Sequence, residues 1–134
     1  MMKITKLLWK AGFKMKAILI DPKEKKISEV DSDFSDIKII HEILQCETFC
    51  GAGVPGSDGT EIFYLDDEGM FNSTDYWNYS GYPQTLAGRG LIVGVGYGGY
   101  ERSTSLTVEE VENKITFNID FDPSTLKFEV IALD

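Results

Sequence analysis

Short apolar runs, each followed by a turn of Asp, Gly or Pro residues, recur along the chain and favour several short strands. The clearest run covers residues 16–20 and is followed by Asp21-Pro22, and a second strand is expected near residues 26–30. Further strands are predicted over residues 60–65, 91–93, 116–121 and 126–133. Because several of the intervening segments have the composition of short turns, we expect a mostly antiparallel arrangement.

Two of the turns predict hairpins. Residues 66–69 tolerate left-handed backbone, so Met70 is expected to begin a return strand after residues 60–65. Residues 122–125 join the last two predicted strands into a closing hairpin. The segment 75–84 is interpreted as an aromatic-rich loop.

Two helices are indicated by their caps and by the spacing of apolar residues. Asp33 or Ser35 is expected to cap a helix that ends near Cys46. Thr107 and Glu110 form a capping box that begins a second helix, over about residues 108–114. The sequence therefore predicts an α+β fold with a mostly antiparallel sheet of about five to seven short strands and two or three short helices.

Length and charge divide the chain into a short basic segment and one domain. At 134 residues the chain has the usual size of a single domain, which we place at residues 15–134. Residues 1–14 carry four lysines and no acidic residue, so residues 15–134 hold a formal charge of −13. Residues 2–13 have the spacing of a short amphipathic helix. We expect this basic extension to fold back onto an acidic, partly apolar face of its own chain or of a neighbour. Its deletion is expected to leave the fold intact and to change the stability or the oligomeric state instead.

The acidic character of the domain argues against some partners and favours others. A charge of −13 repels phosphate backbones and anionic lipids, so neither nucleic acid nor a membrane is expected as a direct partner. Basic or polar protein surfaces are favoured, and a homodimer is a further expectation. Cys46 and Cys50 are too few for a disulfide framework, which favours reduced thiols and a cytoplasmic location.

The sequence offers little for metal binding or catalysis. Four oxygen-bearing residues match positions of a calcium-loop template: Asp31, Asp33, Ser35 and Glu42. Asp36 stands where that template requires a glycine, so helix capping is the favoured interpretation. His41, Cys46 and Cys50 lack the tight pairs of a zinc site, and no Ser or Cys motif points to His41 as a base. We therefore assign no catalytic residue, metal or cofactor, and enzymatic activity is the less favoured class.

A glycine-rich segment follows the predicted strand over residues 91–93. Glycines at 94, 96, 98 and 99 would let a backbone approach a phosphate group. However, the next predicted helix begins only near residue 108 and is too short for a parallel crossover. A flexible loop is therefore favoured over a phosphate-binding loop.

Aromatic residues gather in segments that are predicted to be loops. Tyr, Trp and Arg dominate binding hot spots, because they offer large contact areas with a polar group attached. The residues concerned are Tyr76, Trp77, Tyr79, Tyr82, Tyr97 and Tyr100, with Arg89 expected nearby. Two interpretations stay open: these aromatics form a binding surface, or several of them cover the core.

Several motifs occur in the same order as in a known family. They are MKAILIDP at 15–22, DDEG at 66–69, YPQ at 82–84, LAGRGLIVG at 86–94 and SLTVEEV at 105–111. On these motifs, residues 15–117 resemble a family of short bacterial, phage and plasmid proteins known as a domain of unknown function. The resemblance implies a mobile-element accessory protein and carries over no catalytic residue. It directs attention to the segments 66–69 and 82–90, and thereby to Asp66, Asp67, Glu68 and Gln84.

Two functions are therefore expected, from different classes. The leading one is a non-catalytic binding protein that docks on a host protein through its aromatic loop and acidic surface. The alternative is a small-ligand binder, in which Arg89, Tyr97, Tyr100 and the glycines hold a nucleotide or another anion.

Overall fold

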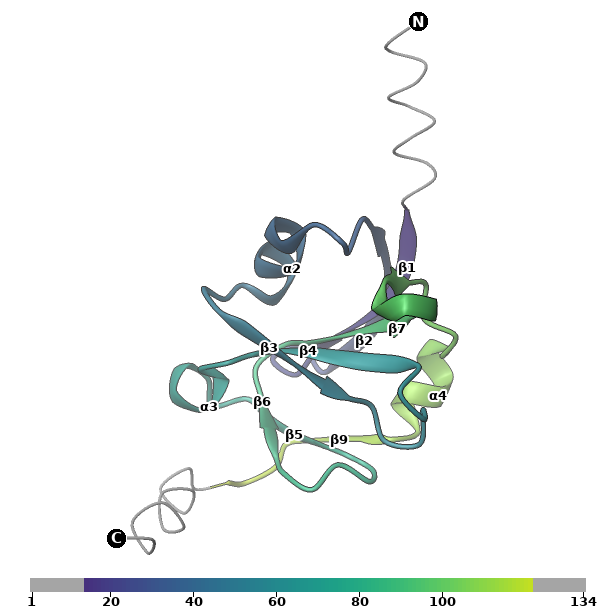
Figure 1. Cartoon of the computed structure of the whole chain (residues 1–134). Helices are drawn as coiled ribbons and strands as arrows, with labels where there is room; N and C mark the ends of the chain where they lie inside the picture. Colours follow the sequence, from purple (N-terminus) through teal and green to yellow (C-terminus); the bar gives the residue numbers. More distant parts are fainter. Residues whose placement is uncertain (1–13, 122–134) are drawn as a thin grey trace, which may run out of the picture.

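The computed structural model describes residues 14–121, apart from the side chains at positions 71 and 72, and these residues form two antiparallel sheets (Figure 1). The larger sheet contains β1 (Met15–Asp21), β2 (Lys26–Ser32), β3 (Phe49–Gly53), β4 (Glu61–Asp66), β7 (Gly90–Val95) and β8 (Glu101–Arg102). The smaller sheet contains β5 (Tyr76–Tyr79), β6 (Leu86–Ala87) and β9 (Ile115–Phe117). The helices are α2 (Ile37–Leu44), α3 (Gly69–Asn72) and α4 (Val108–Glu112), with a 3₁₀ turn, η1 (Tyr97–Gly99).

The larger sheet has the strand order β2-β1-β7-β4-β3, and β8 pairs with the end of β7. Strand β7 lies at its centre, and every residue from Gly90 to Gly94 is buried. A continuously apolar strand of this kind fits a sheet that is covered on both faces. The smaller sheet has the order β6-β5-β9.

Side chains that alternate along the strands of the larger sheet pack into two separate hydrophobic cores, one on each face. Ala17, Leu91 and Val93 pack with Ile40 and Leu44 of α2 on one face. The opposite face packs against the smaller sheet and α4, through Ile18, Ile20, Phe63, Leu65, Ile92, Trp77, Tyr79, Leu86 and Val111. In Figure 1, α2 accordingly lies above the larger sheet and β5, β6 and β9 lie below it.

The predicted fold class is confirmed, and so are several elements. The first two predicted strands are present as β1 and β2, and they pair antiparallel over all seven residues. Helix α2 is capped by Asp36, whose side chain accepts from the Lys38 amide, and not by Asp33 or Ser35. The capping box of Thr107 and Glu110 is present at α4. Nine strands occur over residues 14–121, more than the five to seven expected, because two-residue strands such as β6 and β8 leave no pattern in the sequence.

Two predictions about local structure are wrong. Met70 does not begin a return strand: it lies in α3, and β4 pairs with β3 and β7. The backbone at Gly69 approaches the Ala87 carbonyl so closely that a Cβ there would lie 2.6 Å from its oxygen. The segment 75–84 is not wholly a loop, since Tyr76–Tyr79 forms the central strand of the smaller sheet.

Other predictions concern the ends of the chain. The helix expected over residues 2–13, the strand over 126–133 and the hairpin that this strand would close lie outside the described residues. The predicted strand over 116–121 is shorter, at Ile115–Phe117, and pairs with β5. No helix within residues 14–121 is long and apolar enough to span a bilayer.

Candidate functional site

Trp77 and Tyr79 belong to the core and not to an exposed aromatic surface. Both side chains are buried and both make edge-to-face contacts with Phe63, at ring-centroid distances of 6.0 and 5.0 Å. The Trp77 indole nitrogen donates a hydrogen bond to the Gly88 carbonyl over 2.8 Å. Strand β5 therefore points these residues inward, and the interpretation that aromatics cover the core applies to them.

The remaining aromatics of this segment are half-buried. The Tyr76 ring packs edge-to-face on Phe121, and the Tyr82 ring packs edge-to-face on Phe63, at centroid distances of 5.4 and 6.0 Å. Tyr82 and Gln84 line a shallow polar cavity of about 570 Å³, together with Asn78, Ser80, Thr85, Asn113, Lys114 and Thr116 among others.

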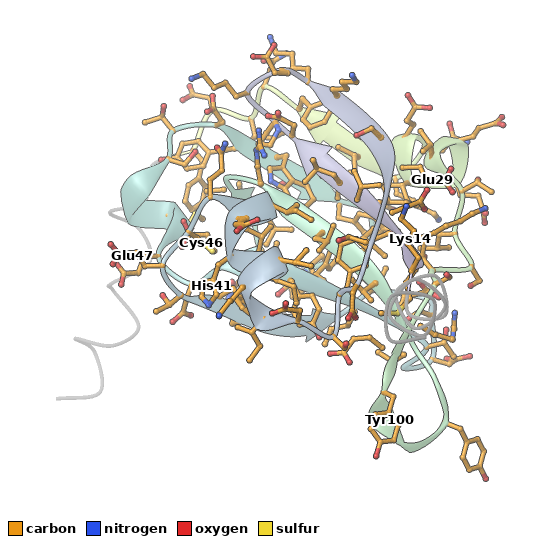
Figure 2. The ribbon with its side chains drawn as sticks, turned by 90° about the horizontal axis from the view of Figure 1, so that it is seen from above. Lys14, Glu29, His41, Cys46, Glu47 and Tyr100 are labelled. Atoms are coloured by element: carbon orange, nitrogen blue, oxygen red, sulfur yellow. The ribbon has the colours of Figure 1, made fainter. Side chains whose placement is uncertain are left out.

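Tyr97 and Tyr100 are the most exposed aromatic residues that the structure describes. They lie in the tyrosine hairpin, which we define as residues 96–100 between β7 and β8. Tyr97 is fully exposed and Tyr100 is 76% exposed. Figure 2 shows Tyr100 on a hairpin that projects from the body of the molecule. Two large aromatic side chains are thus held in solvent by a segment that joins paired strands.

The glycines of this segment are explained by the turn. Gly98 and Gly99 have φ values of +80° and +83°, which L-residues with side chains rarely adopt. The Gly96 amide donates to the Tyr100 carbonyl over 2.7 Å and closes the hairpin. The chain then continues as β8, and α4 begins only at Val108. The strand–loop–helix context of a phosphate-binding loop is therefore not formed by this segment.

A buried carboxylate fixes the base of the tyrosine hairpin. Glu61 is 1% exposed, and its carboxylate pairs with the Arg102 guanidinium at 3.3 Å. It also accepts from the Thr104 hydroxyl, the Ser105 hydroxyl at 2.9 Å and the Ser105 amide at 3.3 Å. Arg102 donates further to the Thr60 and Ser103 carbonyls. The segment after β8 is thereby held against the start of β4.

Tyr64 makes a second contact that holds the same end of the tyrosine hairpin. Its hydroxyl donates to the Glu101 carboxylate over 3.1 Å. Burial, followed by the negative charge of Glu101 and this hydrogen bond, raises the pKa of Tyr64 to about 12. Tyr64 therefore stays protonated and keeps donating throughout the neutral range.

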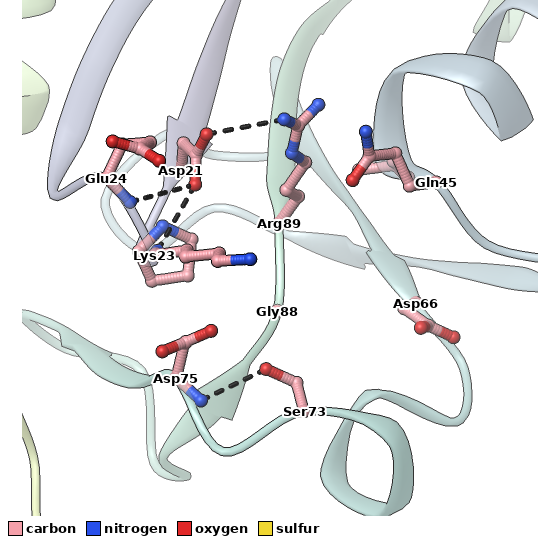
Figure 3. Close-up of a pocket in the computed structure, with 11 residues that line it drawn as sticks. Asp21, Lys23, Glu24, Gln45, Asp66, Ser73, Asp75, Gly88 and Arg89 are labelled. Carbon is pink, nitrogen blue, oxygen red and sulfur yellow. Dashed lines mark hydrogen bonds and ion pairs between the residues drawn. The ribbon is translucent and has the colours of Figure 1, made fainter.

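Arg89 lines a different site, which we call the Arg89 pocket (Figure 3). Its guanidinium donates to the Ile43 carbonyl at the end of α2, over 2.9 Å, and pairs with Asp21 at 3.3 Å. The cavity has a volume of about 380 Å³ and is lined by Asp21, Pro22, Lys23, Glu24, Leu44, Gln45, Asp66, Ser73, Asp75, Gly88 and Arg89. Four of these residues are acidic and two are basic.

The structure brings together some of the predicted site residues and separates others. Asp66 and Arg89, from the segments 66–69 and 86–94, line the same pocket. Asp67 and Glu68 lie exposed in the turn beside it. Arg89 immediately precedes β7 and Tyr97 follows it, so this strand separates them by roughly 20 Å. Arg89 does not share a site with the two exposed tyrosines, contrary to our expectation.

The thiols and the histidine make local contacts. The ring nitrogen Nδ1 of His41 lies 3.2 Å from the Cys46 carbonyl oxygen, and the ring packs edge-to-face on Phe49. Burial, followed by the nearby Asp66 carboxylate, raises the pKa of Cys46 to about 11. Burial and Asp67 raise the pKa of Cys50. Within residues 14–121, no three His, Cys, Asp or Glu side chains are grouped as a metal site would require.

Glu61 and its partners were not predicted from the sequence. A signal was present, because Glu61, Phe63 and Leu65 alternate along one strand and point to the same face. A carboxylate in phase with two buried apolar residues predicts a buried charge that needs several donors. The partners Arg102, Thr104 and Ser105 lie about forty residues away, and only the fold brings them to Glu61.

Comparison with known proteins adds no relative: no protein-family model, curated protein or solved structure matches this chain.

Proposed function

We propose that this chain is a non-catalytic binding protein that docks on a partner protein through the tyrosine hairpin. The observation that carries the proposal is the exposure of two large aromatic side chains on a projecting segment: Tyr97 is fully exposed and Tyr100 is 76% exposed. Large aromatic side chains held in solvent are unfavourable for an isolated domain, and they are typical of binding surfaces.

The way in which the hairpin is held supports this role. The Glu61–Arg102 pair and the Tyr64–Glu101 hydrogen bond fix the strands that lead into and out of it, and the Gly96–Tyr100 hydrogen bond joins its first and last residues. Binding then costs less conformational entropy than it would for a free loop. Tyrosine and glycine are also the residues that dominate the contact loops of natural binding proteins, because tyrosine is rigid and amphipathic while glycine adapts.

Charge suggests the chemistry of the partner. Residues 96–100 carry no charged side chain, whereas the whole chain has a formal charge of −9. A partner with an apolar or aromatic-accepting pocket, surrounded by basic side chains, fits this combination. The resemblance to phage and plasmid accessory proteins favours a protein of the bacterial host as that partner.

The experiment compares three baits in a quantitative pull-down from bacterial lysate. The wild-type chain, the double variant Tyr97→Ser/Tyr100→Ser and the matched control Ile37→Ser are immobilised at equal density. Ile37 is an exposed apolar residue at the start of α2, 60% exposed, and serves as a control for general stickiness. We expect a protein that is enriched by the wild type and by Ile37→Ser and is lost with the double variant. Identical enrichment by all three baits would refute the role of the hairpin.

A second function, binding of a small anion in the Arg89 pocket, is favoured by one observation. Arg89 and Lys23 both line this cavity of about 380 Å³. Against it, the Arg89 guanidinium is already paired with Asp21, and Glu24, Asp66 and Asp75 add negative charge. Thermal-shift measurements with nucleotides and cyclic dinucleotides test it, since a ligand at a hundred times its Kd adds about 2.7 kcal/mol of stability. Absence of any shift, or an equal shift with Lys23→Ala, would exclude an anion in this pocket.

A further inference from the structure

Strand β3 forms one edge of the larger sheet and carries no charged residue. Its sequence is Phe49-Cys50-Gly51-Ala52-Gly53, and Cys50, Gly51 and Gly53 are exposed. At the opposite edge, β2 carries Lys26, Glu29 and Asp31. Charged edge strands resist pairing with other chains, whereas an uncharged, flat edge offers its backbone groups to a further strand. The two edges of this sheet therefore differ in their capacity to bind a strand.

The register of β3 shows which backbone groups are free. The Val54 amide donates to the Glu61 carbonyl, and the Asp67 amide donates to the Thr48 carbonyl, both over 3.1 Å. Because residues of an antiparallel ladder alternate in direction, the even-numbered residues of this strand face β4. The N–H and C=O groups of Phe49, Gly51 and Gly53 then point away from the sheet. No other strand within residues 14–121 pairs with this edge.

We propose that the β3 edge pairs antiparallel with the same edge of a second copy of this chain, about a two-fold axis at Gly51. In this register Gly51 lies opposite its own counterpart, and Phe49 lies opposite Gly53 of the other copy. All three residues with free groups then become hydrogen-bonded pairs, which gives six hydrogen bonds between the copies. A shift of one residue would turn these groups away from their partners, and a shift of two would leave Phe49 or Gly53 unpaired, so the two-fold register at Gly51 makes the most hydrogen bonds.

The side chains fit the same two-fold register. The Phe49 ring lies on the α2 face of the sheet, where it packs edge-to-face on Tyr64 and His41. Opposite it, Gly53 has no atom within 4 Å of the position of a Cβ, so the partner's ring finds open space. An aromatic side chain across from a strand glycine is a favourable pair, because it covers the exposed glycine backbone.

Charges do not oppose this pairing at close range. The register places Glu47 opposite Pro55 of the second copy, so no acidic residue from Glu47 to Pro55 faces an acidic counterpart. Like charges that lie directly opposite each other destabilise strand pairs, and this arrangement avoids them. Because only five residues of each strand pair, the interface is small and the dimer is of the weak, reversible class.

The first test is analytical ultracentrifugation of the full chain over a range of concentrations. We expect a monomer–dimer equilibrium for the wild type, and dimerisation weakened at least about tenfold by Gly53→Lys, since an edge lysine blocks strand pairing. Gly53 is chosen because a side chain there meets no neighbour and should not disturb the fold. Thr74→Lys, at an exposed loop position, adds the same charge and should dimerise like the wild type. A wild-type chain that stays monomeric at all concentrations, or equal loss with both variants, would overturn the proposal.

The second test fixes the register. Cys50 lies opposite Ala52 of the second copy in a pair that is not hydrogen-bonded, where Cα atoms are about 4.5 Å apart, within the range of a disulfide. In a Cys46→Ser background, Ala52→Cys should therefore form disulfide-linked dimers under mild oxidation. In the Cys46→Ser variant alone, the two Cys50 residues of the dimer lie diagonal to each other and not directly opposite. This variant should therefore not form the disulfide-linked dimer. Equal cross-linking of the two variants, or none with Ala52→Cys, would contradict the two-fold register.

Discussion

The indole nitrogen of Trp77 donates a hydrogen bond to the carbonyl oxygen of Gly88 over 2.8 Å, and this contact ties the smaller sheet to the segment that leads into β7. Gly88 has a φ of +77°, a conformation that favours glycine and directs its carbonyl toward the indole. Two residues later, the backbone of Gly90 lies directly against the Trp77 ring. The glycines of this motif are therefore explained by packing between the two sheets.

The first prediction concerns this packing. A Cβ at Gly90 would lie 2.9 Å from Cζ2 of Trp77, and this ring is fully buried and cannot move aside easily. We expect Gly90→Ala to lower the free energy of unfolding by about 1–3 kcal/mol, as overpacking of a core does. Urea denaturation measures the change. Gly53→Ala, where a Cβ meets no atom within 4 Å, is the matched control and should change it by less than about 0.5 kcal/mol.

The second prediction concerns the base of the tyrosine hairpin. Glu61→Gln removes the charge that Arg102, Thr104 and Ser105 satisfy, and should cost about 1–3 kcal/mol of stability. Hydrogen exchange at the Ser105 amide, which donates to Glu61, should become faster than global unfolding explains. Glu29→Gln removes the exposed pair with Lys16 and should cost at most about 1 kcal/mol. An equal loss of unfolding free energy in the two variants would show that the buried hydrogen bonds of Glu61 stabilise the fold no more than an exposed ion pair does.

The third prediction is a pH dependence at Tyr64. The pKa of this group is about 12 in the folded chain and 10 when unperturbed, so the unfolded state releases its proton first as the pH rises. The stabilisation is complete below pH 10 and is lost between pH 10 and 12. Tyr64→Phe should therefore lose less stability than the wild type over this window, as measured by urea denaturation. Tyr97→Phe, at a fully exposed position, should follow the wild type.

The fourth prediction concerns the reactivity of Cys50. Cys50 is an exposed residue, but the partial burial of its thiol and the nearby Asp67 carboxylate raise the pKa of the thiol. Because the thiolate is the reactive form, Cys50 should alkylate slowly with iodoacetamide at neutral pH. Asp67→Asn removes the charge and should speed the reaction in a Cys46→Ser background, while Glu68→Gln should leave the rate unchanged. Mass spectrometry over time measures the rates. Fast alkylation of the parent at pH 7 would show that the thiol is not held in its protonated form.

The sequence predicted those elements whose signals are local. The capping box at Thr107 and the turn at Asp21-Pro22 each act within a few residues, so the pattern is sufficient to locate them. Strand β5 was missed because only four residues alternate there, and they stand next to the turn-forming Gly81 and Pro83. Helix α3 was missed because Gly69 meets the Ala87 backbone, which is a contact between distant segments.

The candidate site was predictable only in part. Tyr97 and Tyr100 could be named from composition, because glycine-flanked tyrosines after a strand suggest a turn with exposed aromatics. That Trp77 is buried while Tyr97 is exposed depends on which segment becomes a strand of the smaller sheet. Arg89 is separated from the tyrosines because β7 runs from Gly90 to Val95. The predicted strand over residues 91–93 was shorter, so the sequence did not show this separation.

The most direct test of the central proposal is site-specific photo-crosslinking. A photoreactive phenylalanine analogue is placed at position 97 in one sample and at position 37 in another, and both are irradiated in bacterial lysate. We expect a discrete cross-linked partner from position 97 that is lost when excess wild-type chain is added and is absent from position 37. The same adducts from both positions, or none that wild-type chain competes away, would contradict the claim that the tyrosine hairpin is a docking surface.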